Sequence, residues 1–261
     1  MGYLYAIQAA FLQNWKEIIG TSNFFIFSLM GSVPTVILLA WLTRESSSPT
    51  VLAYIAIGAS LMVVWNSATW RIGWSLALEV NEGTLEFNLV SRTPLMFTML
   101  GKALALSTFG ALAGLVSLGL FLLVAQQPIT IAHWPLLVVS LIVAMLALIT
   151  CGFILTPLLV LGESRPGSLN AVLPFGVVFS GFVHPIDLLP ASLKPLAWCL
   201  PTAWAMDGSI LAIEGASSPW EIVLDWLVAG GLILVYLGLT QWLFRKVEMR
   251  VRRTGSLTQP F

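Results

Sequence analysis

The sequence has few charges: only 9% of its 261 residues are Asp, Glu, Lys or Arg, whereas 58% are hydrophobic. A soluble domain carries roughly 25% charged residues, and one core could not hide so much apolar surface from water. The scarcity of charge therefore excludes an ordinary soluble domain and predicts a membrane protein. Because 12 basic residues are balanced by 12 acidic ones, nucleic acid is excluded as a partner as well.

Residues and motifs typical of catalytic or metal sites are equally scarce. The chain has two cysteines and two histidines, which predict neither a disulfide framework nor a metal site. No phosphate-binding loop, Gly-x-Ser-x-Gly or His-Glu-x-x-His motif occurs in the sequence. The long apolar runs have no ionisable residue near their middle, which disfavours a proton- or sodium-driven carrier. We expect a protein that is not itself an enzyme and whose work is powered by a partner.

Six apolar runs predict an all-α membrane domain that occupies the whole chain, residues 1–261. A helix needs about 20 apolar residues to cross a hydrocarbon core about 30 Å thick. The runs that reach or approach this length are residues 23–42, 51–70, 99–124, 134–161, 169–183 and 222–244. The fifth is short for a full crossing. An even number of spans places both termini on one side of the membrane.

Two further segments border the spans. In residues 1–20, apolar Leu4, Ile7, Phe11, Trp15 and Ile18 recur at helical spacing, which predicts an amphipathic interface helix that stops near Gly20. The alternative is an N-terminal extension of the first span. After the fifth span, prolines punctuate apolar residues in the segment 184–220. That pattern predicts short, broken helices that re-enter the outer side of the membrane.

The basic residues predict the orientation, because Lys and Arg gather in cytoplasmic loops. With the N-terminus inside, only Arg44 and Lys194 face outward. The other ten face the cytoplasm: Lys16, Arg71, Arg92, Lys102, Arg165, Arg245, Lys246, Arg250, Arg252 and Arg253. We therefore predict cytoplasmic termini, including the basic tail 245–261, and an inward-facing loop at residues 79–94.

That inward loop is the most informative stretch of the chain. A short helix fits residues 84–90, with Leu85 and Leu89 on one side and Glu82 and Glu86 four residues apart on another. Pro94 follows and prevents further helix. Such an acidic and apolar segment would fit a partner groove with an apolar floor and a basic rim. By itself, the pattern is also typical of a polar turn that keeps the loop soluble.

Two blocks of sequence resemble the permeases of type-2 ABC exporters. The first is Glu82-Gly83-Thr84-Leu85-Glu86, followed by Pro94 and Gly101-Lys102, which is similar to the cytoplasmic coupling segment of that family. The second lies downstream in the family's order and consists of Ser180-Gly181-Phe182, Pro185, Leu188-Leu189-Pro190, Leu193, Leu196-Ala197 and Leu200-Pro201-Thr202-Ala203. With six spans and an amphipathic start, the resemblance extends over essentially the whole chain.

The resemblance implies a multi-pass protein of a bacterial-type plasma (inner) membrane. Two permeases, this chain and a second copy or a related one, would be driven by two cytoplasmic ABC ATPase subunits. ATP and Mg²⁺ would bind to the ATPase partner, and this chain would bind no cofactor. Glu82, Gly83, Thr84, Leu85 and Glu86 would contact the ATPase. The exported cargo would be an amphipathic drug, a lipid or a lipid-linked glycan.

The family architecture also implies that the second and fifth spans line a central path. Candidate path residues on these spans are Asn66, Ser67, Thr69, Trp70, Asn170, Phe175, Phe179 and Ser180. Uncharged polar groups among aromatic rings suit an amphipathic cargo. Ser, Thr and Asn also commonly bond one helix to another, and Phe commonly faces lipid, so a purely structural role stays open.

Two other functions are compatible with a chain of this composition. An integral membrane enzyme that modifies lipid would need Ser, His or carboxylate groups clustered at one depth, and His133, His184 and Asp187 are scattered. A channel or gradient-driven carrier would transport its substrate without any nucleotide. Both alternatives remain open at this point, although the sequence supports the exporter better.

Overall fold

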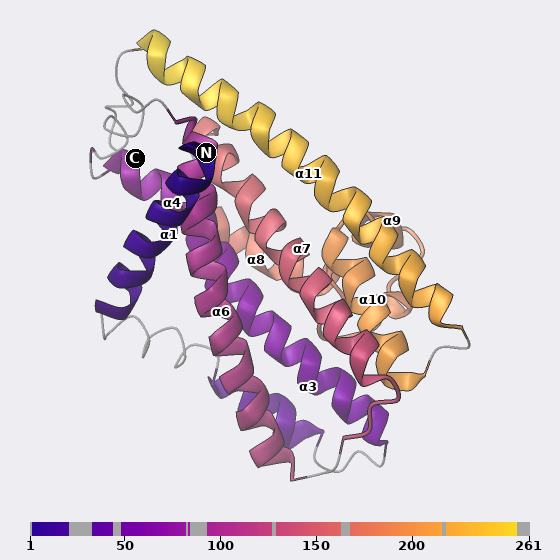
Figure 1. The fold of residues 1–261 in the computed structure, drawn as a ribbon. Helices are drawn as coiled ribbons and strands as arrows, with labels where there is room; N and C mark the ends of the chain where they lie inside the picture. The colour runs from indigo at the N-terminus through magenta and orange to yellow at the C-terminus, as the bar shows by residue number, and fades with distance from the viewer. Residues whose placement is uncertain are drawn as a thin grey trace.

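The computed structural model describes residues 2–20, 33–43, 48–81, 83, 93–126, 129–162, 168–215 and 218–254. Within these ranges the chain is helical and has no β-strand, which confirms the predicted all-α class. Figure 1 shows a bundle of long helices with shorter helices packed on one side.

Among the described residues, three helices are long and apolar enough to cross a membrane: α6 (Leu95–Ala125), α7 (Trp134–Leu161) and α11 (Pro219–Thr254). At 1.5 Å per residue, α6 is about 46 Å long and α11 about 54 Å. The predicted span 134–161 matches α7. Helix α11 continues past its predicted end at Phe244, because the Arg, Lys, Glu and Met residues that follow are good helix formers.

The second predicted span is one long helical segment with an irregular turn. Helix α3 (Pro49–Val64) leads into a π-helical turn, η1 (Trp65–Thr69), and then into α4 (Trp70–Asn81). Pro49 begins this segment in the first turn, where its missing N–H costs no hydrogen bond. The helix therefore runs beyond the predicted end at Trp70 and carries Arg71 and Glu79 on α4.

The first and fifth predicted spans are represented by shorter helices. In the range 23–42, the described part is the helix Val33–Leu42. The fifth contains α8 (Ser168–Phe179), whose 12 residues are about 18 Å long and too short to cross a bilayer alone. Helix α8 stops before the predicted end at Val183, because the chain turns at Gly181 with a φ of +73°.

In its described residues, the Pro-rich segment contains three short helices, as the prolines predict: η2 (Ile186–Leu188), α9 (Lys194–Trp198) and α10 (Pro201–Glu214). Their re-entry into the membrane stays a prediction. Helix α10 packs against both α7 and α11. Small buried residues permit this close packing, namely Ala203, Ala205, Gly208, Ser209 and Ala212. The end of α10 is also bonded to the chain before α7, since Ala132 and His133 donate their N–H groups to the carbonyls of Ile213 and Ala212.

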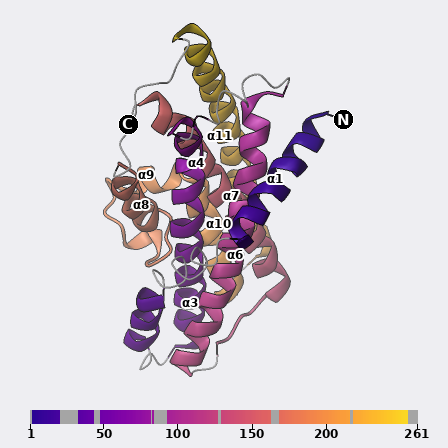
Figure 2. The ribbon, with the colours of Figure 1, turned by 90° about the vertical axis from the view of Figure 1, so that its left-hand side faces the viewer.

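The predicted interface helix corresponds to α1 (Gly2–Gly20). The residues that directly follow Gly20 lie outside the described part of the chain, so the predicted stop at Gly20 stays a prediction. Figure 2 shows α1 lying along the outside of α6. Ile7, Phe11, Trp15 and Ile18 of the predicted stripe are buried or half-buried, whereas Leu4 is exposed. The two helix backbones approach closely at Gly101, where a Cβ atom would lie 2.4 Å from the Ile7 carbonyl oxygen. A larger residue at this position would force α1 away from α6.

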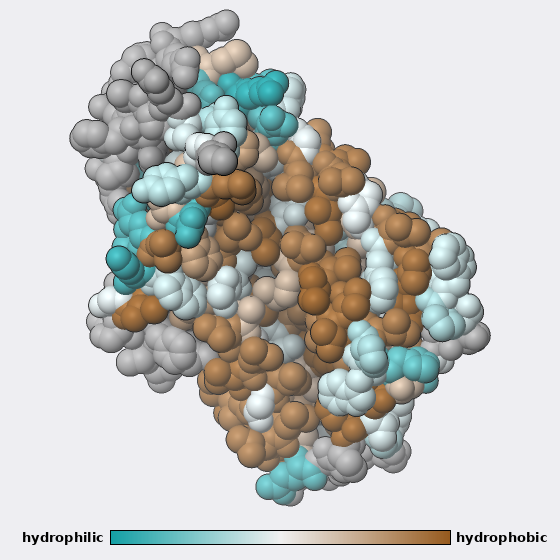
Figure 3. All heavy atoms as spheres, viewed as in Figure 1, coloured by the Kyte–Doolittle hydropathy of each residue, from teal (hydrophilic) through white to brown (hydrophobic). Residues whose placement is uncertain are grey.

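Charge divides the described part of the bundle into two ends. The basic end contains α1, α4, the start of α6 and the last turns of α7 and α11. The acidic end contains η2, α9, α10 and the start of α11. Figure 3 shows a broad hydrophobic face between them, with hydrophilic residues gathered toward α1 and the far end of α11. The described charges at the acidic end are Asp187, Lys194, Asp207, Glu214, Glu221 and Asp225.

Candidate functional site

The predicted coupling residues fall mainly outside the part of the chain that the structure describes. Glu82, Thr84, Leu85 and Glu86 are not described, nor is the helix predicted over 84–90. Gly83 alone is described: it is exposed and has a φ of +70°, a left-handed conformation that glycine adopts without strain. The helices on either side, α4 and α6, belong to the described part of the chain.

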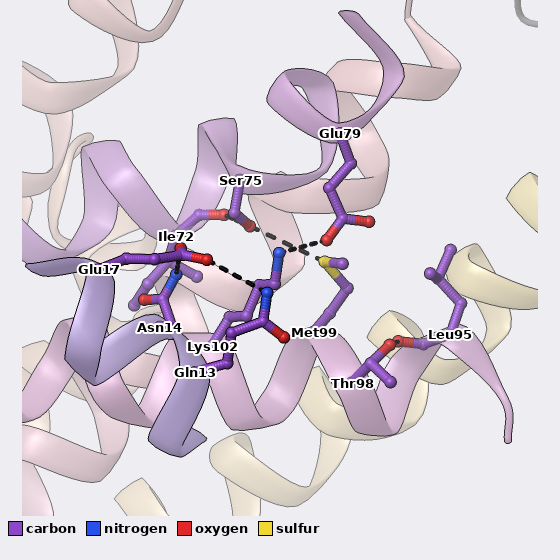
Figure 4. Close-up of polar contacts among 10 residues, drawn as sticks. All are labelled: Gln13, Asn14, Glu17, Ile72, Ser75, Glu79, Leu95, Thr98, Met99 and Lys102. Atoms are coloured by element: carbon purple, nitrogen blue, oxygen red, sulfur yellow. Dashed lines mark hydrogen bonds and ion pairs between the residues drawn. The ribbon is translucent and has the colours of Figure 1, made fainter. Parts of the chain in front are cut away.

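An ion pair joins the two helices that flank the predicted coupling segment. Figure 4 shows Lys102 of α6 reaching Glu79 of α4, and the ammonium group donates a hydrogen bond to the carboxylate. The Glu79 side chain is only 4% exposed and that of Lys102 is 20% exposed. Since the pair is largely removed from water, it ties the end of α4 to the first turns of α6.

Helix α11 is bonded to the same region through its extension. The backbone N–H of Leu95 donates to Oε1 of Glu248 over 2.9 Å. The first N–H groups of a helix have no partner within the helix, and the helix dipole favours a carboxylate there. Arg250 in turn donates to the carbonyl of Leu161, at the end of α7, over 3.0 Å. Two charged residues of α11 thus bind two neighbouring helix ends.

A polar pocket of about 300 Å³ lies beside this ion pair, between α1, α4 and α6. Two tryptophans, Trp70 and Trp74, form part of its wall. Its polar lining residues are Asn14 and Glu17 from α1, Arg71, Ser75 and Glu79 from α4, and Lys102 from α6. The pocket therefore brings charges of both signs together.

The α1 wall of this pocket presents hydrogen-bond acceptors. The Asn14 amide nitrogen donates to Oε2 of Glu17 over 3.3 Å, and Gln13 donates to Oε1 of the same carboxylate over 3.2 Å. The other side-chain atom of Asn14, Oδ1, is buried and has no hydrogen-bond partner within the described chain. Such a group costs free energy unless something else donates to it.

The candidate path residues lie on segments that do meet. Helix α8 packs against η1, with Gly176 facing the Trp65 ring. Asn66, Trp70, Asn170 and Phe175 are exposed, whereas Thr69, Phe179 and Ser180 are buried. The side chain of Ser67 lies outside the described part of the chain. The buried members contact other helices, so a cargo could reach them only if those helices moved apart.

The second sequence block forms a tight junction with α3 at the acidic end. Tyr54 donates its hydroxyl to the carbonyl of Gly181 over 2.6 Å, and the hydroxyls of Ser180 and Thr202 are 2.7 Å apart. A Cβ atom at Gly58 would lie 1.9 Å from the carbonyl oxygen of Phe182. Only glycine permits this approach, so the block Ser180-Gly181-Phe182 is held against α3 by backbone contact.

Comparison with known proteins identified no relative. No protein-family model and no curated protein matches this chain. The resemblance to type-2 exporters therefore depends on the two sequence blocks.

Sequence reasoning did not predict the pocket. Its polar residues come from three segments that are far apart in the chain, so no local motif marks them. A weaker signal was present: Arg71, Glu79 and Lys102 are the charges nearest to two long apolar runs, and they include both signs. Charges so close to a membrane boundary commonly pair with one another.

Proposed function

We propose that the chain is the membrane subunit of an ATP-driven type-2 exporter that moves an amphipathic or lipid-like substrate out of the cytoplasm or the inner leaflet. In this proposal the six predicted spans cross a bacterial-type inner membrane, and the basic end faces the cytoplasm. A second permease copy and two ATPase subunits complete the transporter. The two sequence blocks and the grouping of positive charge at one end support the proposal.

The observation that carries the proposal is a set of contacts between the helices on either side of the predicted coupling segment. The buried Glu79–Lys102 pair connects α4 to α6, and Glu248 connects the start of α6 to α11. A movement of residues 82–92 would therefore displace three helices together. This linkage suits a protein that has no nucleotide-binding motif of its own and receives its energy through a cytoplasmic contact.

The test is a charge placed on the apolar side of the coupling segment. In Leu85→Arg, we expect the ATPase subunit to stop co-purifying and transport-coupled ATP hydrolysis in proteoliposomes to fall at least tenfold, because the ATPase would lose an apolar contact. The matched control is Met249→Arg, since Met249 is 51% exposed in the predicted cytoplasmic tail, where an added charge should be tolerated. Full coupling in Leu85→Arg would refute the proposal.

A further inference from the structure

Asp225 is a buried carboxyl group at the acidic end of the bundle. It lies in the second turn of α11, a helix that packs against α10 (Figure 1), and the residue is only 7% exposed. Its Oδ2 atom is buried and has no hydrogen-bond partner within the described chain. A carboxylate in such a place loses its hydration and gains no donor, whereas a neutral carboxyl group is much less costly to bury.

Helix α10 covers Asp225 because a glycine faces it. A Cβ atom at Gly208 would lie 3.5 Å from the Asp225 Cβ atom and 3.4 Å from the Trp226 indole nitrogen. That nitrogen is already bonded, since it donates to the Ser140 hydroxyl of α7 over 2.9 Å. The indole N–H of the neighbouring residue therefore binds α7 and not the Asp225 carboxyl group.

The charged groups near Asp225 on its own helix and on α10 are acidic. Glu221 lies one turn earlier on α11, and Asp207 precedes Gly208 on α10; both would repel a negative charge on Asp225. Glu214, at the end of α10, adds another carboxylate to this end of the bundle. The field of these groups therefore favours an uncharged Asp225 side chain.

The other described elements around Asp225 supply no positive charge to balance it. Helix α7 contains no Asp, Glu, Lys or Arg residue, and His133, which precedes its first turn, is exposed. The described lysine of this end, Lys194, lies 3.3 Å from Oδ1 of Asp187. No three His, Cys, Asp or Glu side chains in the described ranges could hold a metal ion together. A proton is therefore the cation that suits this carboxyl group.

We propose that Asp225 is a proton-binding site, which takes up one proton from water when α10 packs onto α11 and holds it in the folded protein. The proton forms an O–H bond on the carboxyl group, and no other bond forms or breaks. This site goes beyond the proposed transport function, because it requires only the chain itself and no ATPase. In the predicted orientation it responds to the pH outside the cell: α10 stays in place at acidic and neutral pH, and its packing weakens in alkaline medium.

The experiment compares the unfolding of the wild-type chain and Asp225→Asn in mixed micelles, at full length and without an ATPase. Asparagine has the shape of aspartic acid and is uncharged at every pH, so it imitates the protonated side chain. The unfolded wild-type chain releases the Asp225 proton in mild acid, while the folded chain keeps it. The unfolding equilibrium constant of the wild type, divided by that of the variant, should therefore rise about tenfold per pH unit from about pH 5 to about pH 6. A constant or falling ratio would overturn the proposal, as would a ratio that changes when potassium replaces sodium.

Infrared spectroscopy detects the proton itself and keeps the test valid if Asp225→Asn fails to fold. The wild type should show the C=O band of a protonated carboxyl group at neutral pH. In Glu221→Gln, an exposed negative charge one turn away is removed, so this band should disappear at a lower pH. The matched control is Asp187→Asn, which changes a side chain that is 90% exposed and should leave the band unchanged. Absence of the band from the wild type would overturn the proposal and leave the Leu85→Arg test of transport unaffected.

Discussion

The two ends of the bundle are held together by different kinds of contact. At the basic end, charged side chains join the helices: Lys102 binds Glu79, Glu248 binds the start of α6, and Arg250 binds the end of α7. At the acidic end, the ion pair between Lys194 and Asp187 is exposed, and neutral groups make the less exposed contacts, as between Tyr54 and Gly181, and between Ser140 and the Trp226 indole N–H.

The difference shows where each end can respond to its surroundings. A charged contact can exchange one partner for another when a protein or lipid brings a new charge nearby, since its energy depends on the local environment. A junction made of close backbone contacts has no such alternative. We therefore expect the basic end to receive signals and the acidic end to keep its geometry.

The largest effect should come from breaking the ion pair at the basic end. Lys102→Met removes the cation beside Glu79, whose side chain is 4% exposed, and should lower the free energy of unfolding by about 3 kcal/mol in mixed micelles. The double variant Glu79→Gln with Lys102→Met should regain most of this loss.

The corresponding control is the ion pair at the acidic end. Lys194 and Asp187 are 3.3 Å apart, and the Asp187 side chain is 90% exposed. Lys194→Met should therefore lower the free energy of unfolding by less than about 1 kcal/mol. Equal losses at the two ends would remove the distinction between them.

A smaller loss is expected from enlarging the residue at the neutral junction. In Gly58→Ala, the new methyl group would meet the Phe182 carbonyl oxygen, and the resulting shift should lower the free energy of unfolding by about 1–3 kcal/mol. Gly231→Ala is the matched control, because a Cβ atom there meets nothing within 4 Å. That control should be neutral or stabilising by up to about 1 kcal/mol. If both variants behave alike, the close contact with α3 has no energetic importance.

The smallest loss should come from a single neutral hydrogen bond. Tyr54→Phe removes the buried 2.6 Å bond to Gly181 and should reduce the free energy of unfolding by about 1 kcal/mol. Tyr236→Phe removes a longer bond of 3.3 Å, to the Cys199 carbonyl, at an exposed position and should cost less. Thermal unfolding followed by circular dichroism compares the two. The opposite order would show that the Tyr54 contact does not hold the junction.

Much of the helical framework could be predicted from the sequence. The apolar runs of α6, α7 and α11 are long enough to be recognised by composition alone, and the spacing of Ile7, Phe11 and Ile18 predicts the amphipathic α1. These features depend on the length and spacing of apolar stretches along the chain, which can be seen in a single sequence.

The position of α10 and the composition of the pocket could not be predicted in the same way. Helix α10 follows several prolines and is rich in small residues, a pattern that identifies a broken segment but not its place between α7 and α11. The pocket joins Asn14, Arg71 and Lys102, whose proximity results from the crossing of α1 over α6 and from the π-helical turn. Tertiary packing determines both features.

That π-helical turn has a consequence for the direction in which α4 faces. A regular α-helix advances about 100° per residue, and a π-helical turn accommodates one more residue than an α-helical turn does. Deleting one residue from Trp65–Thr69 would therefore rotate everything beyond it by about 100°, turning Arg71 and Glu79 away from α1 and α6. A single surplus residue in this turn thus determines which way α4 faces relative to α3.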